Sequence, residues 1–197
     1  MKRLRNLGEC ILASKSPRRE EILSIIDLNF KIYPSKINEE EFLKYPPEVS
    51  AKLCAEKKAE TVSKIFENNL IIAADTLVLY KGKILGKPET ETESYEMLNM
   101  LSGSIHKVVT GVAIQKKSEN LIESFYSTTE VKIKPLSDET IKFYIKAYKP
   151  FDKAGSYGIQ DWFASQVDSI KGCYYNVMGL PLSKLYSLLL TLSSKNR

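Results

Sequence analysis

Two stretches of the chain carry residues whose types and spacing suit chemistry on an anionic substrate. In the first, the apolar run Leu70–Ala73 leads into Asp75, and Leu77–Tyr80 resumes the apolar pattern. Such runs are typical of a buried strand, where a carboxylate is costly unless a cation or several hydrogen bonds satisfy it. A glycine turn then returns the chain to Lys87. We therefore expect Asp75 and Lys87 near the ends of adjacent strands, with Asp75 as either a structural or a working acid.

The second stretch begins after the apolar run Cys10–Ala13, which predicts a short first strand. A serine suited to N-capping is followed by Pro17, which is favoured at the first position of a helix. Free N–H groups and the helix dipole make such a place an anion site, and hydroxyl and guanidinium donors strengthen it. The alternative is a capped surface helix with solvated arginines. The side chains of the predicted phosphate site are Ser14, Ser16, Arg18 and Arg19.

An acidic segment and a helix follow. Three consecutive acids, Glu39, Glu40 and Glu41, most often form a solvated charge run, but oxygen ligands beside a phosphate site also suit Mg²⁺. A helix is predicted over Glu48–Glu67, and Lys57 lies off its apolar stripe, as a solvent-facing lysine would. The stripe consists of Ala51, Ala55, Ala59, Val62 and Phe66.

The remaining pattern alternates helices and strands. His106 alternates with apolar residues on one strand face, where a hydrogen-bonded sheet residue is commoner than a catalyst. Phe151–Gln160 is a glycine-bearing loop with an acid, a lysine and an amide, and no dinucleotide or P-loop pattern occurs. The predicted elements are a helix at Thr90–Ser102, strands at Ser104–Gln115 and Ile122–Ile133, a helix capped by Ser137 and a last helix from Leu182.

Composition excludes several classes of protein. A chain of 197 residues fits one domain, by a prior of roughly 100–200 residues per domain. Its net charge of +5 suits an anionic ligand but is too diffuse to predict nucleic-acid binding. Three scattered cysteines and one histidine predict neither disulfides nor a zinc site. Because no apolar run approaches the roughly 18 residues of a membrane span, we expect a cytoplasmic protein with no membrane partner.

Five groups of residues, in chain order, resemble the motifs of the Maf family of nucleoside triphosphate pyrophosphatases. They are Ile11–Arg19; Ala74–Thr76 with Gly86–Pro88; Leu101–Gly103 with His106 and Thr110–Gly111; Asp152–Gln160; and Asn176–Leu182. The matches extend over nearly the whole chain, so the resemblance implies a single domain over residues 1–197. The fold it implies is a Maf-like (ITPase-like) α/β fold, in which a mixed sheet with flanking helices forms two lobes around a central cleft.

The resemblance also implies an activity and assigns roles to residues. A nucleoside triphosphate would be hydrolysed between its α and β phosphates, to the monophosphate and pyrophosphate, with Mg²⁺ or Mn²⁺ as cofactor. Asp75 matches the catalytic proton acceptor, and Glu39 matches a loop glutamate that would hold the metal with Asp75, with Glu40 and Glu41 as alternatives. The matches to substrate-binding positions are Arg18, Thr76 and Gln160 for substrate choice and Lys57 and Lys87 for phosphate contact.

The loop Asp152–Gln160 resembles the branch that acts on dTTP and UTP more than the branch that acts on 7-methyl-GTP. One departure falls next to it, because Asp161-Trp162 follows Gln160 where that branch usually continues with glycine. Two alternatives stay open: the same chemistry on another nucleotide such as 7-methyl-GTP, or a non-catalytic nucleotide-binding protein that regulates division. The resemblance is to house-cleaning hydrolases of nucleotide metabolism, and it leaves a homodimer open.

Overall fold

The computed structural model describes residues 4–195, which form two compact units. Unit 1 takes the described residues of Met1–Asp75, Thr110–Ser127 and Gly179–Arg197, and unit 2 takes Thr76–Val109 and Thr128–Met178. The chain passes from one unit to the other four times, after Asp75, Val109, Ser127 and Met178. Across the described residues, no helix combines the length and hydropathy needed to cross a membrane.

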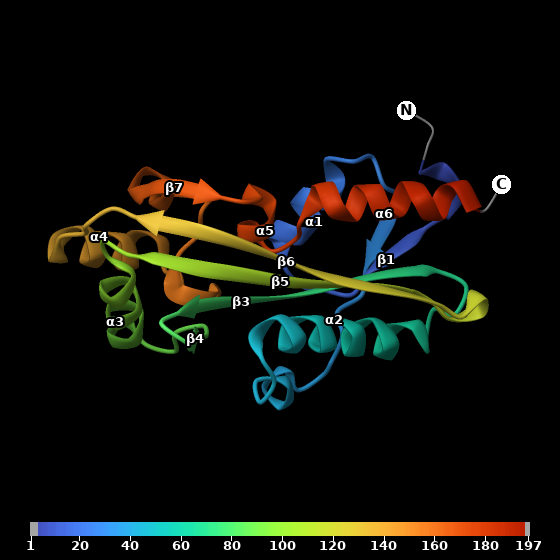
Figure 1. Cartoon of the computed structure of the whole chain (residues 1–197), viewed down its shortest axis with the longest axis horizontal. Helices are drawn as coiled ribbons and strands as arrows, with labels where there is room; N and C mark the ends of the chain where they lie inside the picture. Colours follow the sequence, from blue (N-terminus) through green and yellow to red (C-terminus); the bar gives the residue numbers. More distant parts are fainter. Residues whose placement is uncertain (1–3, 196–197) are drawn as a thin grey trace. The chain divides into compact units, whose positions relative to one another are not determined.

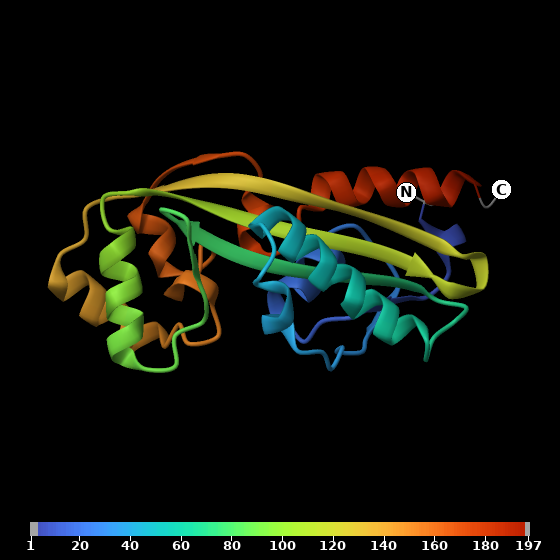
Figure 2. The ribbon, with the colours of Figure 1, turned by 60° about the horizontal axis from the view of Figure 1, so that its bottom comes forward.

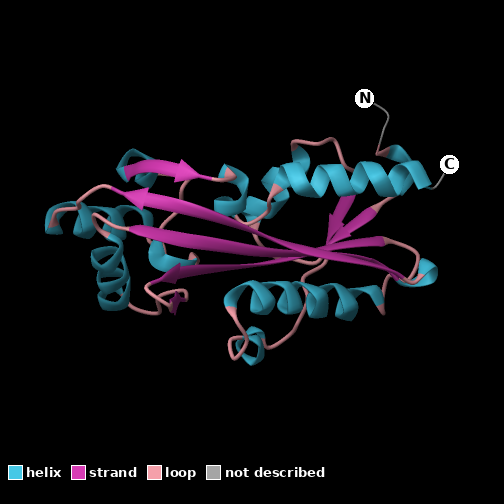
Figure 3. Cartoon of the chain, in the orientation of Figure 1, coloured by secondary structure: helices cyan, strands magenta, loops and turns pink. Residues whose placement is uncertain are grey.

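A mixed seven-stranded sheet supplies the framework (Figure 3). Its strands are β1 (Cys10–Leu12), β2 (Phe30–Ile32), β3 (Leu70–Tyr80), β4 (Lys83–Leu85), β5 (Ile105–Lys116), β6 (Leu121–Ile133) and β7 (Val167–Lys171). The hydrogen-bonded order is β2-β1-β3-β5-β6-β7, with β4 paired to β3. The helices, labelled in Figure 1, are α1 (Pro17–Ser24), α2 (Pro47–Ser63), α3 (Glu91–Leu101), α4 (Asp138–Tyr148), α5 (Tyr174–Met178) and α6 (Leu182–Lys195).

In unit 1, β1 runs parallel to both β2 and β3, and α2 and α6 lie on opposite faces of the strands (Figures 1 and 2). Because both faces are covered, every residue of Leu70–Ala74 is buried. The apolar core on the α2 face is formed by Ile11, Ala13, Ala55, Ala59, Val62, Ile71, Ala73 and Ala113. The predicted stripe of the second helix therefore packs on the sheet.

In unit 2, α3 and α4 pack against each other, and both helices have side-chain N-caps. The hydroxyl of Thr90 accepts a hydrogen bond from the backbone N–H of Glu93 at 3.1 Å. The hydroxyl of Ser137 accepts one from Thr140 N–H at 3.2 Å, which confirms the predicted cap.

Two boundaries differ from the prediction by several residues. Asp75 was expected near the end of a strand. This is wrong, because Asp75 lies in the middle of β3, which is 11 residues long and continues to Tyr80. Beyond Asp75 the strand is extended by its antiparallel pairing with β4, in which Val78 faces Leu85. The helix predicted to reach Glu67 ends at Ser63, because the N–H groups of the next residues fold back onto the carbonyl of Val62.

Gly111 on β5 lies directly against the backbone of α2. A Cβ atom at this position would collide with the carbonyl group of Ala51. We predict that Gly111→Ala lowers the free energy of unfolding by about 1–3 kcal/mol, since neither backbone can move freely. Urea unfolding measures the change, and Gly86→Ala, with open space around its Cβ position, is the matched control. Equal stability of both variants would contradict this packing.

Candidate active site

The centre of the candidate site in unit 1 is the Lys58 ammonium group on α2. Its Nζ donates to Asp75 Oδ1 at 2.7 Å and to Glu39 Oε1 at 2.8 Å. The carbonyl of Ala74 lies 3.5 Å from the same nitrogen. Lys58 is only 4% exposed and Asp75 7%, so two buried charges neutralise each other next to a more exposed glutamate. The pair therefore satisfies the buried carboxylate that the sequence placed in this strand.

The charges around Asp75 shift the pKa values of its neighbours. Burial opposes the charge on Lys58, but the adjacent carboxylates outweigh it and hold its pKa above the ordinary value. Burial, together with the charge of Asp75, raises the pKa of Cys54 to about 12. The site at neutral pH thus combines a charged lysine with a protonated thiol beside the carboxylate.

A second group of polar residues gathers where β1 passes into α1. Arg19 Nη1 donates to the Ser14 hydroxyl at 3.0 Å, and Nε donates to the carbonyl of Gly179 at 2.9 Å. The backbone N–H of Ser16 also donates to the Ser14 hydroxyl, at 3.2 Å. Ser16 occupies the predicted N-cap position of α1 in an extended conformation, but its side chain makes no capping hydrogen bond. These contacts fix the guanidinium group at the start of the helix.

The two groups of unit 1 lie within electrostatic range of each other. Burial holds the pKa of Arg19 below its ordinary value, although the negative charges of Asp75 and Glu39 oppose this shift. Lys58 in turn experiences the positive charge of Arg19. The arrangement places two buried or half-buried cations beside a carboxylate pair, which is a suitable environment for phosphate oxygens and an attacking water.

The sequence comparison covers nearly the whole chain. Residues 9–192 match the model of the family described as Maf-like protein. This chain belongs to the Maf family.

Several relatives of this chain are named dTTP/UTP pyrophosphatase. The dTTP/UTP pyrophosphatase of Carboxydothermus hydrogenoformans is 48% identical over 175 residues, which cover 89% of this chain and 94% of the relative. The enzyme of the same name from Clostridium tetani is 44% identical, over 91% of this chain and 95% of the relative. The one from Thermosipho africanus is 45% identical, over 91% of both chains. Among solved structures, the Staphylococcus aureus Ham1 protein aligns over 64% of this chain and 72% of its own, with a TM-score of 0.42 and 15% identity. That likeness is too weak to add to the family assignment.

The structure brings some of the predicted residues of this Maf protein together. Ser14 contacts Arg19, and Glu39 meets Asp75 through Lys58. Of the three neighbouring glutamates, Glu39 makes this contact. Arg18 lies half-buried in the first turn of α1, next to Arg19.

The other predicted residues lie elsewhere. Thr76, Lys87 and Gln160 belong to unit 2, where Lys87 and Gln160 are exposed. Lys57 is half-exposed and its Nζ donates to Glu60 on the same helix at 2.8 Å. Its assignment to phosphate contact stays a prediction, although the structure places Lys58, not Lys57, at Asp75.

Sequence reasoning missed Lys58, and a signal for it was present. Lys58 lies three residues after Ala55 and four before Val62, so it falls on the buried face of α2. A lysine on the apolar stripe of a helix needs a buried carboxylate partner, and Asp75 was the only acid predicted inside a buried strand.

His106, from the Maf-like motif of β5, lies in unit 2 as a buried sheet residue. Its Nε2 is 2.7 Å from the Tyr157 hydroxyl, and the two rings meet edge-on with centroids 5.4 Å apart. Its Nδ1 is buried without a hydrogen-bond partner among the described residues. Burial therefore lowers the pKa of His106 to about 4.

Replacing Lys58 tests the buried ion pair. We predict that Lys58→Met lowers the free energy of unfolding by about 3 kcal/mol, because it leaves the Asp75 carboxylate buried without a counter-charge. Lys57→Met is the matched control and should cost no more than about 0.5 kcal/mol, since its ion pair with Glu60 is exposed. Chemical denaturation of both variants at neutral pH is the measurement. Equal losses would refute the buried pair.

His106 makes stability depend on acidity. Its imidazole is neutral in both states at pH 7, but below about pH 6.5 the unfolded chain binds a proton that the folded chain accepts only near pH 4. Stability is therefore lost as the pH falls through this range. We predict that the native protein loses about 3 kcal/mol more than His106→Gln between pH 7 and pH 4. Parallel loss in both proteins, measured by urea unfolding, would contradict the neutral buried imidazole.

Proposed function

We propose that this Maf protein is a nucleoside triphosphate pyrophosphatase that acts on dTTP and UTP. The reaction hydrolyses the bond between the α and β phosphates and releases the nucleoside monophosphate and pyrophosphate. The observation that carries the proposal is the pairing of Lys58 with Asp75 and Glu39 beside Arg19. The relatives named dTTP/UTP pyrophosphatase support the choice of substrate.

Each group in unit 1 has a role in this chemistry. Asp75 accepts the proton of the attacking water as general base, through its Oδ atoms on β3. Arg19, held by Ser14 and Gly179, binds phosphate oxygens and neutralises the charge that develops on the leaving pyrophosphate. Lys58 holds the Asp75 carboxylate in place and adds positive charge beside it. Phosphoryl chemistry requires mostly positioning and charge neutralisation, which these rigidly held cations provide.

The acidic side chains fit a divalent cation that shares its coordination with substrate. Glu39 and Asp75 each direct one oxygen to the Lys58 nitrogen, so the two carboxylates lie close together. Residues 4–195 contain no cluster of three His, Cys, Asp or Glu side chains for a closed metal cage. Mg²⁺ commonly uses one or two carboxylates and completes its shell with water and phosphate oxygens. Glu39 and Asp75 would hold the cation, which neutralises phosphate charge and acidifies bound water.

Residues of unit 2 complete the proposal. Lys87 would contact phosphate, and Thr76 and Gln160 would take part in nucleotide selection. Arg18 of unit 1 would also affect substrate choice, and residues 1–197 would act as a single pyrophosphatase domain. Cys10 and Cys54 are buried free thiols, which supports the cytoplasm as the place of action.

A nucleotide panel tests the reaction and its substrate. We expect pyrophosphate release from dTTP and UTP with Mg²⁺ or Mn²⁺, and loss of release when a chelator is added. Preferential release from 7-methyl-GTP would keep the chemistry and overturn the substrate. Binding of nucleotides without release from any of them would favour a non-catalytic binding protein.

Asp75→Asn tests the general base. The amide keeps the shape of the side chain but cannot accept the proton, so turnover should fall by about 10²–10⁴-fold. Nucleotide binding, measured by calorimetry, should persist. Tyr95→Phe, a change in α3 of unit 2, serves as a control for preparation and folding. Undiminished turnover of the Asn variant would remove Asp75 from this role.

A further inference from the structure

We propose that Tyr144 and Asp161 are positioning residues that fix Gln160 for nucleotide selection. The proposal rests on the proposed function, in which Gln160 selects the nucleotide. It concerns Asp161, the residue that directly follows Gln160.

One tyrosine hydroxyl holds the loop on both sides of Gln160. The backbone N–H of Gly158 donates to Tyr144 Oη at 3.0 Å, and the hydroxyl donates onward to Asp161 Oδ2 at 3.0 Å. The other carboxylate oxygen of Asp161 accepts from Phe163 N–H at 2.9 Å and caps the 3-10 helix Trp162–Gln166. Gln160 is thus enclosed between two anchored backbone positions, while its own side chain is exposed.

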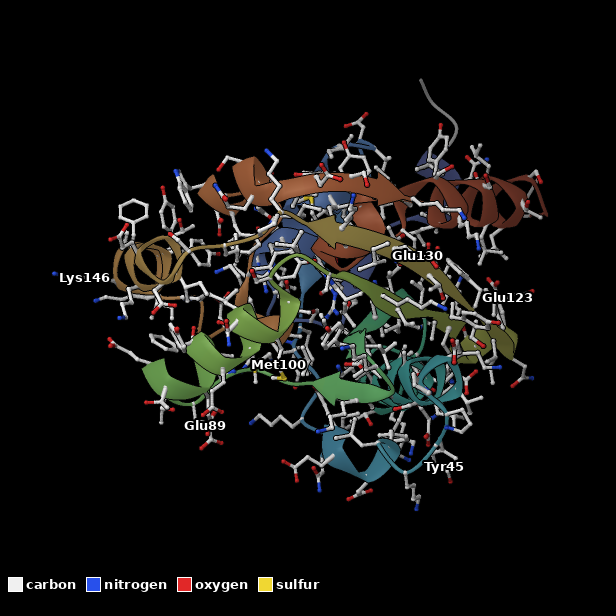
Figure 4. The ribbon with its side chains drawn as sticks, turned by 60° about the vertical axis from the view of Figure 1, so that its left-hand side comes forward. Tyr45, Glu89, Met100, Glu123, Glu130 and Lys146 are labelled. Carbon is white, nitrogen blue, oxygen red and sulfur yellow. The ribbon has the colours of Figure 1, made fainter. Side chains whose placement is uncertain are left out.

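The anchor itself is rigid. Tyr144 is fully buried, and its ring packs on Phe163, Tyr148 and Trp162, with centroid distances of 4.8, 5.2 and 6.1 Å. Tyr144 therefore points into unit 2 from α4, whereas Lys146 on the same helix extends outward (Figure 4). Since aromatic packing fixes the ring, the position of its hydroxyl is fixed as well.

The fit between Gly158 and Asp161 is close. A Cβ atom on Gly158 would collide with Asp161 Oδ2 and would lie 2.9 Å from Lys153 Cε. Glycine at position 158 is therefore required while the Asp161 carboxylate occupies this place. A glycine at position 161 would remove the carboxylate, and with it both the cap and the hydrogen bond from Tyr144.

The same loop is anchored at its start. Gly155 N–H donates to the carbonyl of Gly86 at 2.9 Å, and the Ser156 hydroxyl lies 2.5 Å from that of Ser94. Gly155 and Ser156 adopt φ values of +68° and +63°, which the surrounding contacts hold in place. With both ends fixed, the loop loses little conformational freedom when a nucleotide binds, and this lowers the KM.

The primary test compares two Tyr→Phe variants in unit 2. Tyr144→Phe removes the hydroxyl and keeps the packed ring. We expect the KM for dTTP and UTP to rise about fivefold, because both hydrogen bonds of the hydroxyl are lost, the one from Gly158 and the one to Asp161. The kcat should stay within about twofold, because Asp75 and Lys58 are unchanged. Tyr95→Phe is the control, since it also removes a tyrosine–aspartate hydrogen bond, to Asp138 at 2.6 Å, but leaves the loop intact.

Double variants separate positioning from a general loss of stability. In a Gln160→Ala background, Tyr144→Phe should leave the KM unchanged, because there is no longer a side chain to position. Gly158→Ala should raise the KM of the native chain. Added to Asp161→Gly, it should raise the KM of that variant by a smaller factor, because the missing carboxylate makes room for the methyl group. Hydrogen exchange of the Gly158 amide should accelerate in Tyr144→Phe and stay unchanged in Tyr95→Phe.

The outcomes distinguish this proposal from the proposed function. If the native protein hydrolyses dTTP and UTP but Tyr144→Phe matches Tyr95→Phe in KM, the positioning role is overturned and the function stands. A rise in KM that persists without Gln160 also overturns it. If the native protein hydrolyses neither nucleotide, the proposed function fails and the positioning role fails with it.

Discussion

The buried ion pair of Lys58 and Asp75 is the constraint on which the arrangement of unit 1 depends. A carboxylate inside a strand that is covered on both faces needs a cation or several hydrogen bonds beside it, and here the cation comes from the helix packed on that strand. A well-packed hydrophobic pair at such a place is often as stable or more stable. The pair is therefore better explained by chemistry than by folding. Ser14 and Gly179 hold Arg19 nearby, so the positive charge is rigid before any phosphate arrives.

How far the sequence predicts this site depends on the kind of information each residue carries. Asp75 and Arg19 could be found because an acid in an apolar run and arginines at a helix start are visible locally. The choice between Lys57 and Lys58 depends on which way α2 faces, and adjacent lysines differ there by about 100° of rotation. Family resemblance identified the segment, but only packing identified the residue beside Asp75.

Features of the fold also differ in whether the local sequence predicts them. The cap at Ser137, the proline at the start of α1 and the strands of the central sheet follow from local pattern. The continuity of β3 through Asp75 does not, because it depends on pairing with β4, and neither does the end of α2 at Ser63. The departure at Asp161 was visible as a difference from the family, whereas its contacts with Tyr144 and Phe163 join segments that no local pattern relates.

The division of the chain between the units has a consequence for synthesis. Unit 2 has all its residues once Met178 has left the ribosome, but unit 1 lacks α6 until the residues after Gly179 have followed. Until α6 has been made, β3 therefore lies in a sheet with one face uncovered. Premature termination before α6 would remove the buried side chains of Leu185 and Leu189. The apolar residues that α6 covers would then be exposed. Truncated chains of this kind are suited to recognition by chaperones and proteases.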